Sequence, residues 1–335
     1  MRALVLTPTS LQVQDIDKPI PTDYQVLIQV EACGLCRTDL HIIDKELPQL
    51  DSSKIPQSII LGHQIVGRIS SIGKNVKSLE IGKRVGVTWL GNTCQSCSYC
   101  LNDQENLCDS PQFTGFNSPG GMAQYCCADA QFIVPLDDKA DPILLAPLLC
   151  AGIIGYRTYL SCLDSNSNAK TIGIYGFGSA AHLLTQLLSQ MSCSIHAFTK
   201  ENDLLSQKLA INSGAKWAGG INEKPVMLDA AIIFASAGDL VTLALKQVKK
   251  GGTVVCGGIH MSDIPSFPYE DLWNERSIKS VANLKRSDAL SYFKLIEKYT
   301  VTPQVTVYSL ENALQAIIDL KNGQIQGSTV IRIEH

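Results

Sequence analysis

Four cysteines stand within one short, polar stretch of the chain. They follow the pattern Cys-x-x-Cys-x-x-Cys-x7-Cys and are Cys94, Cys97, Cys100 and Cys108. Thiolates at such spacings can converge on one Zn²⁺ as a closed tetrahedral site, which leaves no open position for a substrate. We therefore expect a structural zinc that holds the loop. An iron–sulfur cluster uses the same ligands, and free or disulfide-bonded cysteines are the remaining alternative.

Three more side chains that can bind a metal are scattered along the sequence. Cys36 lies in Gly-Leu-Cys-Arg-Thr-Asp-Leu-His (34–41), His63 in Gly-His-Gln (62–64), and Cys150 in Ala-Pro-Leu-Leu-Cys-Ala-Gly (146–152). Taken singly, each has an ordinary explanation, because a buried cysteine often serves as a small apolar core residue. A lone histidine is likewise more often a core residue than a ligand.

A glycine-rich turn follows an apolar run at 171–175. Gly176, Gly178 and Ala181 form the pattern Gly-x-Gly-x-x-Ala, and an amphipathic helix is predicted over 182–191. In dinucleotide-binding proteins the first glycine allows the tight turn and the second lets the backbone approach the pyrophosphate. The helix N-terminus then offers free N–H groups to the phosphates. The motif predicts a dinucleotide site.

The residues after the next strand, 194–198, bear on which dinucleotide is used. An acidic residue at this point accepts hydrogen bonds from the ribose of NAD, whereas a cation accommodates the 2′-phosphate of NADP. Thr199 and Lys200 stand there, and they favour NADP(H) over NAD(H). The alternative is that Glu201 serves the ribose if the turn is offset by two residues.

The elements that must position these groups differ between the two parts of the chain. Before about residue 140 the sequence favours short strands and lacks long helical periodicity, with strands expected at 26–30, 67–73 and 84–87. After residue 150 apolar strands alternate with helices, which predicts a doubly wound domain with a parallel sheet. Those strands are 171–175, 194–198, 228–235 and 253–256; near the C-terminus we expect helices at 289–298 and 311–321 and a strand at 329–333.

The composition limits the class of protein. The chain has 335 residues, a net charge of -3 at pH 7, 45% hydrophobic and 18% charged residues. At roughly 100–200 residues per domain, two domains are expected. The near-neutral balance gives no reason to expect nucleic acid or a membrane as a partner. The most apolar run, 143–159, falls short of the ~20 residues of a membrane span, and without a signal peptide we expect a cytoplasmic location.

Together these motifs resemble, in order and spacing, the zinc-dependent alcohol dehydrogenases of the medium-chain dehydrogenase/reductase superfamily. The resemblance covers nearly the whole chain and is closest to short bacterial members with a Gly-Phe-Gly turn and the segment Gly-Ile-His-Met-Ser-Asp-Ile-Pro (258–265). It implies an α/β protein with a GroES-like, β-rich catalytic domain at 1–151 and 285–335. A Rossmann domain with a parallel sheet would be inserted at 152–284.

The resemblance also implies a second zinc site and roles for its neighbours. Cys36, His63 and Cys150 would hold a catalytic zinc with one open position, giving two Zn²⁺ per chain. By the same resemblance, Thr38 would contact the substrate oxygen through its hydroxyl, and His41 would be the outer histidine of a proton relay. Asp39 would orient the zinc-binding histidine, and Arg37 would contact the cofactor pyrophosphate. Without it, Thr38 and His41 read as ordinary residues of a helix N-terminus.

Two positions bear on substrate and rate. Trp89 resembles the aromatic wall of the family's substrate pocket, which would favour short primary alcohols and aldehydes; the alternative is a core anchor. Gln64 stands where the family usually has glutamate. The three expected zinc ligands are kept, but the negative charge of the glutamate is lost, which would bear on the rate.

The function implied is reversible hydride transfer between an alcohol and NAD(P). Rivals are a cinnamyl-type aldehyde reductase, a polyol dehydrogenase, and a non-catalytic zinc or nucleotide sensor. Polyol enzymes tend to have glutamate in place of Cys150. The resemblance further implies a homodimer or homotetramer.

Overall fold

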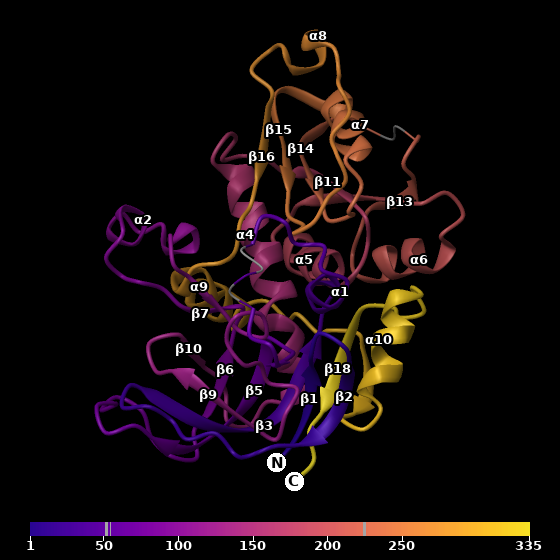
Figure 1. Ribbon diagram of the computed structural model, residues 1–335. Coiled ribbons are helices and arrows are strands. Elements are labelled where there is room, and N and C mark those ends of the chain that lie inside the picture. The colour runs from indigo at the N-terminus through magenta and orange to yellow at the C-terminus, as the bar shows by residue number, and fades with distance from the viewer. Residues whose placement is uncertain (51–52, 54, 224–225) are drawn as a thin grey trace. The chain divides into compact units, whose positions relative to one another are not determined.

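The computed structural model describes residues 1–50, 53, 55–223 and 226–335. The chain divides into two compact units (Figure 1). Unit 1 comprises Met1–Cys150, Asn283–Leu290 and Gln304–His335, and unit 2 comprises Ala151–Ala282 and Ser291–Pro303. The chain thus leaves unit 1 after Cys150 and returns to it at Asn283. The domain bounds given above stay a prediction.

Unit 1 is built around a mixed sheet with β3 (Gln25–Leu35) at its centre. The strand order is β10-β6-β5-β3-β18-β17, and β9 also pairs with β3. Among the described strands of this sheet, β17 and β18 run parallel and the other neighbouring pairs run antiparallel. The other strands are β5 (Gln64–Ile72), β6 (Arg84–Val87), β9 (Tyr125–Asp129), β10 (Ile133–Pro135), β17 (Val305–Ser309) and β18 (Ser328–Arg332). The β-rich character expected for this part of the chain is confirmed.

Smaller elements complete unit 1. A three-stranded sheet has the order β2-β1-β4 and a two-stranded sheet joins β7 to β8. These strands are β1 (Arg2–Leu6), β2 (Leu11–Asp15), β4 (Ile59–Ile60), β7 (Leu90–Asn92) and β8 (Gln112–Phe113). The helices are α1 (Arg37–Ile43), α2 (Ser98–Leu101), η2 (Glu105–Leu107), α3 (Pro142–Leu145), η3 (Ala146–Leu149) and α10 (Ala313–Lys321). Periodicity alone did not indicate α1, because seven residues are too few for a helical period to stand out; the alternative interpretation of Thr38 and His41 did place a helix N-terminus there.

Unit 2 is a doubly wound parallel sheet. Its order is β13-β12-β11-β14-β15-β16, and every neighbouring pair runs parallel. In order along the chain this is 3-2-1-4-5-6, the arrangement of dinucleotide-binding domains, so the predicted fold class is confirmed. The strands are β11 (Thr171–Tyr175), β12 (Ser194–Thr199), β13 (Trp217–Gly220), β14 (Leu228–Ile233), β15 (Val248–Cys256) and β16 (Ser277–Ser280).

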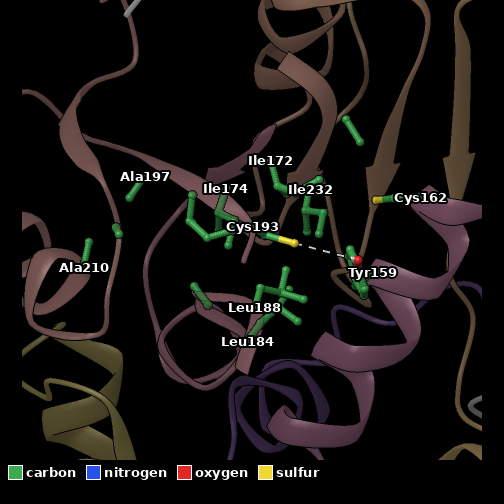
Figure 2. Close-up of a cluster of buried hydrophobic side chains, with 14 of the residues drawn as sticks. Tyr159, Cys162, Ile172, Ile174, Leu184, Leu188, Cys193, Ala197, Ala210 and Ile232 are labelled. Atoms are coloured by element: carbon green, nitrogen blue, oxygen red, sulfur yellow. Dashed lines mark hydrogen bonds between the residues drawn. The ribbon is translucent and has the colours of Figure 1, made fainter. Parts of the chain in front are cut away.

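Helices cover both faces of the unit 2 sheet. Figure 2 shows one core cluster, in which Ile172 and Ile174 of β11 pack with Leu184 and Leu188 of the following helix. Tyr175, the next residue of β11, packs in a second cluster on the opposite face, because strand side chains alternate between faces. The helices are α4 (Ala151–Leu163), α5 (Ser179–Gln190), α6 (Leu204–Asn212), α7 (Asp239–Gln247) and α8 (Tyr269–Leu272); α9 (Arg286–Ile296) begins in unit 1.

One helical stretch, Pro142–Leu163, has the length and hydropathy of a membrane span. Its most apolar window has a mean hydropathy of 1.6, and 67% of that window is buried inside the fold. Burial of this kind is typical of a core helix. Within α4, Tyr159 lies among the core residues of unit 2, where its hydroxyl is 3.9 Å from Cys193 Sγ (Figure 2).

Candidate active site

Three ligands far apart in the sequence meet in unit 1. The metal-binding atoms of Cys36, His63 and Cys150 all lie within 4.8 Å of one another. Cys36 precedes α1, His63 stands in the turn before β5, and Cys150 follows η3. Two thiolates and one imidazole suit Zn²⁺ and leave one of four tetrahedral positions for another ligand.

The local backbone explains how His63 reaches this cluster. Gly62 has a φ of +97°, and a Cβ there would lie 2.6 Å from Cys33 Sγ. Only glycine fits such a turn without strain. The His63 ring is fully buried; its Nδ1 faces the Asp39 carboxylate, and its Nε2 has no hydrogen-bond partner among the described residues. A buried imidazole nitrogen of this kind fits a metal ligand, because a metal ion would satisfy it.

Asp39 is the charged neighbour of His63. Its Oδ1 lies 3.4 Å from His63 Nδ1, and its Oδ2 accepts the backbone N–H of Cys36 at 2.8 Å. Burial lowers the pKa of His63, but Asp39 and the Cys36 thiol outweigh this and raise the pKa to about 10. One carboxylate therefore orients two of the three ligands, which is the arrangement expected around a metal-binding histidine.

The two thiols of the cluster interact directly. A hydrogen bond with Cys150 lowers the pKa of Cys36 well below its usual value, although burial opposes this, and the nearby His63 lowers it further. The same hydrogen bond raises the pKa of Cys150. The pair thus shares its protons unevenly and supplies one thiolate readily. A divalent cation favours the second thiolate, because thiols bind metals in the deprotonated form.

Helix α1 presents the other residues predicted near the metal. Thr38 is 9% exposed, and its Oγ1 lies 3.6 Å from Cys36 Sγ. His41, also mostly buried, has Nδ1 at 2.9 Å from Glu46 Oε2. Arg37 is exposed. No sequence motif pointed to Glu46, although it lies only five residues beyond His41.

The four-cysteine loop forms a second candidate metal centre. The Sγ atoms of Cys94, Cys97, Cys100 and Cys108 all lie within 4.8 Å of one another. Backbone N–H groups point at the sulfurs, from Cys94 to Cys108 Sγ at 3.3 Å and from Cys97 to Cys94 Sγ at 3.3 Å. Hydrogen bonds from the backbone of Ser96 and Cys97 lower the pKa of Cys94 to about 6. Such N–H groups stabilise thiolates, so this centre fits a closed Zn²⁺ site.

The glycine-rich turn of unit 2 lies between β11 and α5, as predicted. Gly176 has a φ of +84°, and a Cβ there would lie 2.9 Å from the backbone nitrogen of Ala235. Gly178 caps α5 without a side-chain hydrogen bond and faces open space. Ala181 is fully buried in the core. The turn therefore leaves room for a phosphate at the N-terminus of α5, and it fits a dinucleotide.

A cavity of about 320 Å³ lies beside the carboxyl ends of β12 and β13. Thr199 at the end of β12 is buried, and its hydroxyl is engaged with Gly219 O at 3.3 Å and Gln207 Nε2 at 3.1 Å. Lys200 is exposed. Glu201, which lines the cavity, accepts a hydrogen bond from Asn222 at 2.6 Å. Lys200 and Glu201 are thus both exposed here, whereas Thr199 is buried.

Comparison with known proteins identifies the family. The family described as the alcohol dehydrogenase GroES-like domain matches residues 22–138. The probable alcohol dehydrogenase AdhA of Mycobacterium tuberculosis is 38% identical over 322 residues, which cover 94% of this chain and 90% of that protein. An alcohol dehydrogenase of Geobacillus stearothermophilus is 31% identical, covering 97% and 96% of the two chains.

The chain belongs to the alcohol dehydrogenase family of the medium-chain dehydrogenase/reductase superfamily. It is therefore an oxidoreductase that acts on a small molecule. Among solved structures, the acetophenone reductase of Geotrichum candidum in complex with NAD superposes with a TM-score of 0.86 at 26% identity, covering 99% of this chain and 96% of that one. The fold, the family and the type of reaction predicted from the motifs are confirmed.

Trp89 has a more constrained position in this alcohol dehydrogenase than the sequence suggested. It is 5% exposed, stacks on Phe113 with ring centroids 4.9 Å apart, and meets His63 edge-on at 5.1 Å. Its indole Nε1 donates to Asn283 Oδ1 at 3.1 Å. No sequence signal pointed to Asn283, because the two residues are 194 positions apart.

Proposed function

We propose that this alcohol dehydrogenase transfers a hydride reversibly between a short primary alcohol and NADP⁺, at a zinc site formed by Cys36, His63 and Cys150. The observation that carries the proposal is the convergence of these three ligands within 4.8 Å. A zinc ion held there would act as a Lewis acid that lowers the pKa of an alcohol hydroxyl. The four cysteines of 94–108 would hold a second, structural zinc.

The surrounding side chains have separable tasks in this proposal. Asp39 keeps His63 oriented by its charge and holds the backbone of Cys36 by a hydrogen bond. Thr38 offers a buried hydroxyl beside Cys36 that can accept a hydrogen bond from a substrate hydroxyl and, on taking up its proton, release its own towards the relay. His41, whose Nδ1 lies 2.9 Å from the Glu46 carboxylate, would pass the proton onward.

The cofactor would bind at the turn of Gly176, Gly178 and Ala181, and the role of Arg37 at its pyrophosphate stays a prediction. Lys200 supports NADP(H), because an exposed ammonium attracts a 2′-phosphate. Thr199 supports it less than expected, since its hydroxyl is already engaged within unit 2. Glu201 is turned to Asn222, but its negative charge opposes a phosphate.

Trp89 supports a preference for small substrates. A large, nearly immobile indole edge-on to His63 leaves less room beside the metal ligands than a small side chain would. The expected homodimer or homotetramer and the cytoplasmic location stay predictions.

A panel of alcohols and aldehydes tests the proposal, read by nicotinamide absorbance with both cofactors. We expect the highest kcat/KM with short primary alcohols and NADP⁺. A strong NAD⁺ preference would overturn the cofactor assignment. Turnover confined to bulky secondary or aromatic alcohols would overturn the role of Trp89, and the absence of turnover with any alcohol would overturn the reaction.

A further inference from the structure

One amide side chain joins the four-cysteine loop to the tryptophan that packs on His63. Asn283 Nδ2 donates to the backbone oxygen of Asn106 at 2.8 Å, and Asn283 Oδ1 accepts from Trp89 Nε1 at 3.1 Å. Asn106 stands two residues before Cys108, within the loop of residues 94–108 that we call the zinc lobe. All of these residues belong to unit 1.

The far end of this link reaches the catalytic ligands. Trp89 is held between the stacked ring of Phe113 and the ring of His63, which it meets at an interplanar angle of 77°. His63 itself is fully buried. Protein interiors are packed about as densely as organic crystals, so a shift of the indole displaces its neighbours. The orientation of Trp89 therefore bears on the orientation of His63.

The chemistry of the link suits an amide. An indole N–H can only donate a hydrogen bond, and a backbone carbonyl can only accept one. The side chain between them must offer an acceptor and a donor, as asparagine does. An aspartate at 283 would keep the acceptor for Trp89 but would set a carboxylate oxygen against the carbonyl of Asn106. Asn283 has a φ of +56°, a backbone region in which asparagine and aspartate are both enriched.

A second contact fixes the same returning segment to the zinc lobe. Arg286 donates from its backbone N, Nε and Nη2 to the Glu105 carboxylate, with the shortest contact at 2.6 Å. Glu105 precedes Asn106 in the lobe, and Arg286 follows Asn283 by three residues. The segment 283–290 is thus bound to the zinc lobe at two neighbouring residues, Asn283 and Arg286. Of these, Asn283 also accepts a hydrogen bond from Trp89.

We propose that Asn283 is a positioning residue that couples the zinc lobe to the catalytic metal site, through Trp89 and His63. The inference rests on the proposed zinc site of Cys36, His63 and Cys150. It gives the structural metal a second role, because order in the lobe would set the alignment of a catalytic ligand as well as the stability of unit 1.

The test uses the full chain loaded with Co²⁺, whose visible absorption reports the geometry of its thiolate and imidazole ligands. Asn283→Asp and Trp89→Phe are each expected to shift that spectrum and to lower kcat about three- to tenfold with little change in KM. Because both act along one path, the double variant should be no worse than the more affected single variant.

Asn102→Asp is the matched control. Asn102 also donates its amide to a backbone carbonyl, that of Ser98 at 2.8 Å, but this bond is exposed and local and does not join the link through Asn283, so the same chemical change there should leave the spectrum and kcat at wild-type values. Two Co²⁺ per chain with an unmoved spectrum in Asn283→Asp, or additive losses in the double variant, would overturn the coupling alone. A wild-type chain that takes up only one Co²⁺ would contradict the proposed function and the coupling with it.

Discussion

Asp39 Oδ1 lies 3.4 Å from His63 Nδ1, and both side chains are completely buried. The other oxygen of the same carboxylate holds the backbone N–H of Cys36. A buried charge costs free energy unless it is paired and hydrogen-bonded. We infer that Asp39 is kept because it aligns the ligands of the catalytic metal.

Substitution of Asp39 by asparagine is expected to weaken zinc binding at Cys36, His63 and Cys150 by about 10–100-fold. The amide keeps one acceptor but loses the charge that orients His63. Competition with a chromophoric chelator measures the affinity. Asp203→Asn is the control, since Asp203 caps α6 through the N–H of Ser206 and asparagine is an equally good cap. Equal zinc affinity in Asp39→Asn and wild type would contradict the assignment.

Substitutions of the two glycines of the dinucleotide turn are expected to have different effects, one on stability and the other on cofactor binding. Gly176→Ala places a Cβ against Ala235 at a positive φ, so it should lower the free energy of unfolding by about 1–3 kcal/mol. Gly178→Ala meets no atom within 4 Å, so its stability should stay near that of the wild type. Its new methyl group would instead occupy space meant for the pyrophosphate.

Denaturant unfolding and cofactor titration separate these effects. For Gly178→Ala we expect a cofactor Kd raised about tenfold or more, equivalent to the ~1.4 kcal/mol of a lost close approach. Unchanged cofactor binding in that variant would place the dinucleotide elsewhere.

The Glu105–Arg286 pair is expected to make the stability of unit 1 depend on pH. Burial raises the pKa of Glu105, but the hydrogen bonds from Arg286 outweigh it, so the pKa is lowered in the folded protein. A lowered folded pKa stabilises the fold above the unfolded value of about 4.5, and the benefit is lost as the pH falls through the folded pKa.

Glu105→Gln should therefore cost about 1 kcal/mol at pH 7, a modest figure because Arg286 is partly exposed. The difference from wild type should shrink as the pH falls from about 5 to about 3. Urea unfolding at several pH values measures it, with the exposed Glu80→Gln as control. A gap that stays constant or widens towards low pH would contradict this account of the pair.

The features predicted correctly from the sequence are those that depend on residues close together in the chain. The four cysteines of the zinc lobe lie within fifteen residues, so their spacing alone indicated a shared metal. The turn from Gly176 into α5 and the strand 194–198, which lies within β12, depend on neighbouring residues and were also predicted. The doubly wound sheet followed from the alternation of such elements.

Contacts between distant segments could not be predicted in the same way. The convergence of Cys36, His63 and Cys150 came from a resemblance, because nothing in their spacing brings them together. The link from Asn106 through Asn283 to Trp89 had no sequence signal, because Asn283 lies 177 positions from Asn106 and 194 positions from Trp89. Strand β17, Val305–Ser309, was missed because its residues are half-buried or exposed and alternate weakly.

Metal analysis of wild type and Cys36→Ser, each paired with an alcohol turnover assay, tests the central claim most directly. We expect close to two Zn²⁺ per chain in the wild type, and one Zn²⁺ with no measurable turnover in Cys36→Ser. A wild type that holds one Zn²⁺, or a Cys36→Ser chain that still oxidises alcohol at the wild-type rate, would contradict the claim that Cys36, His63 and Cys150 form the catalytic zinc site.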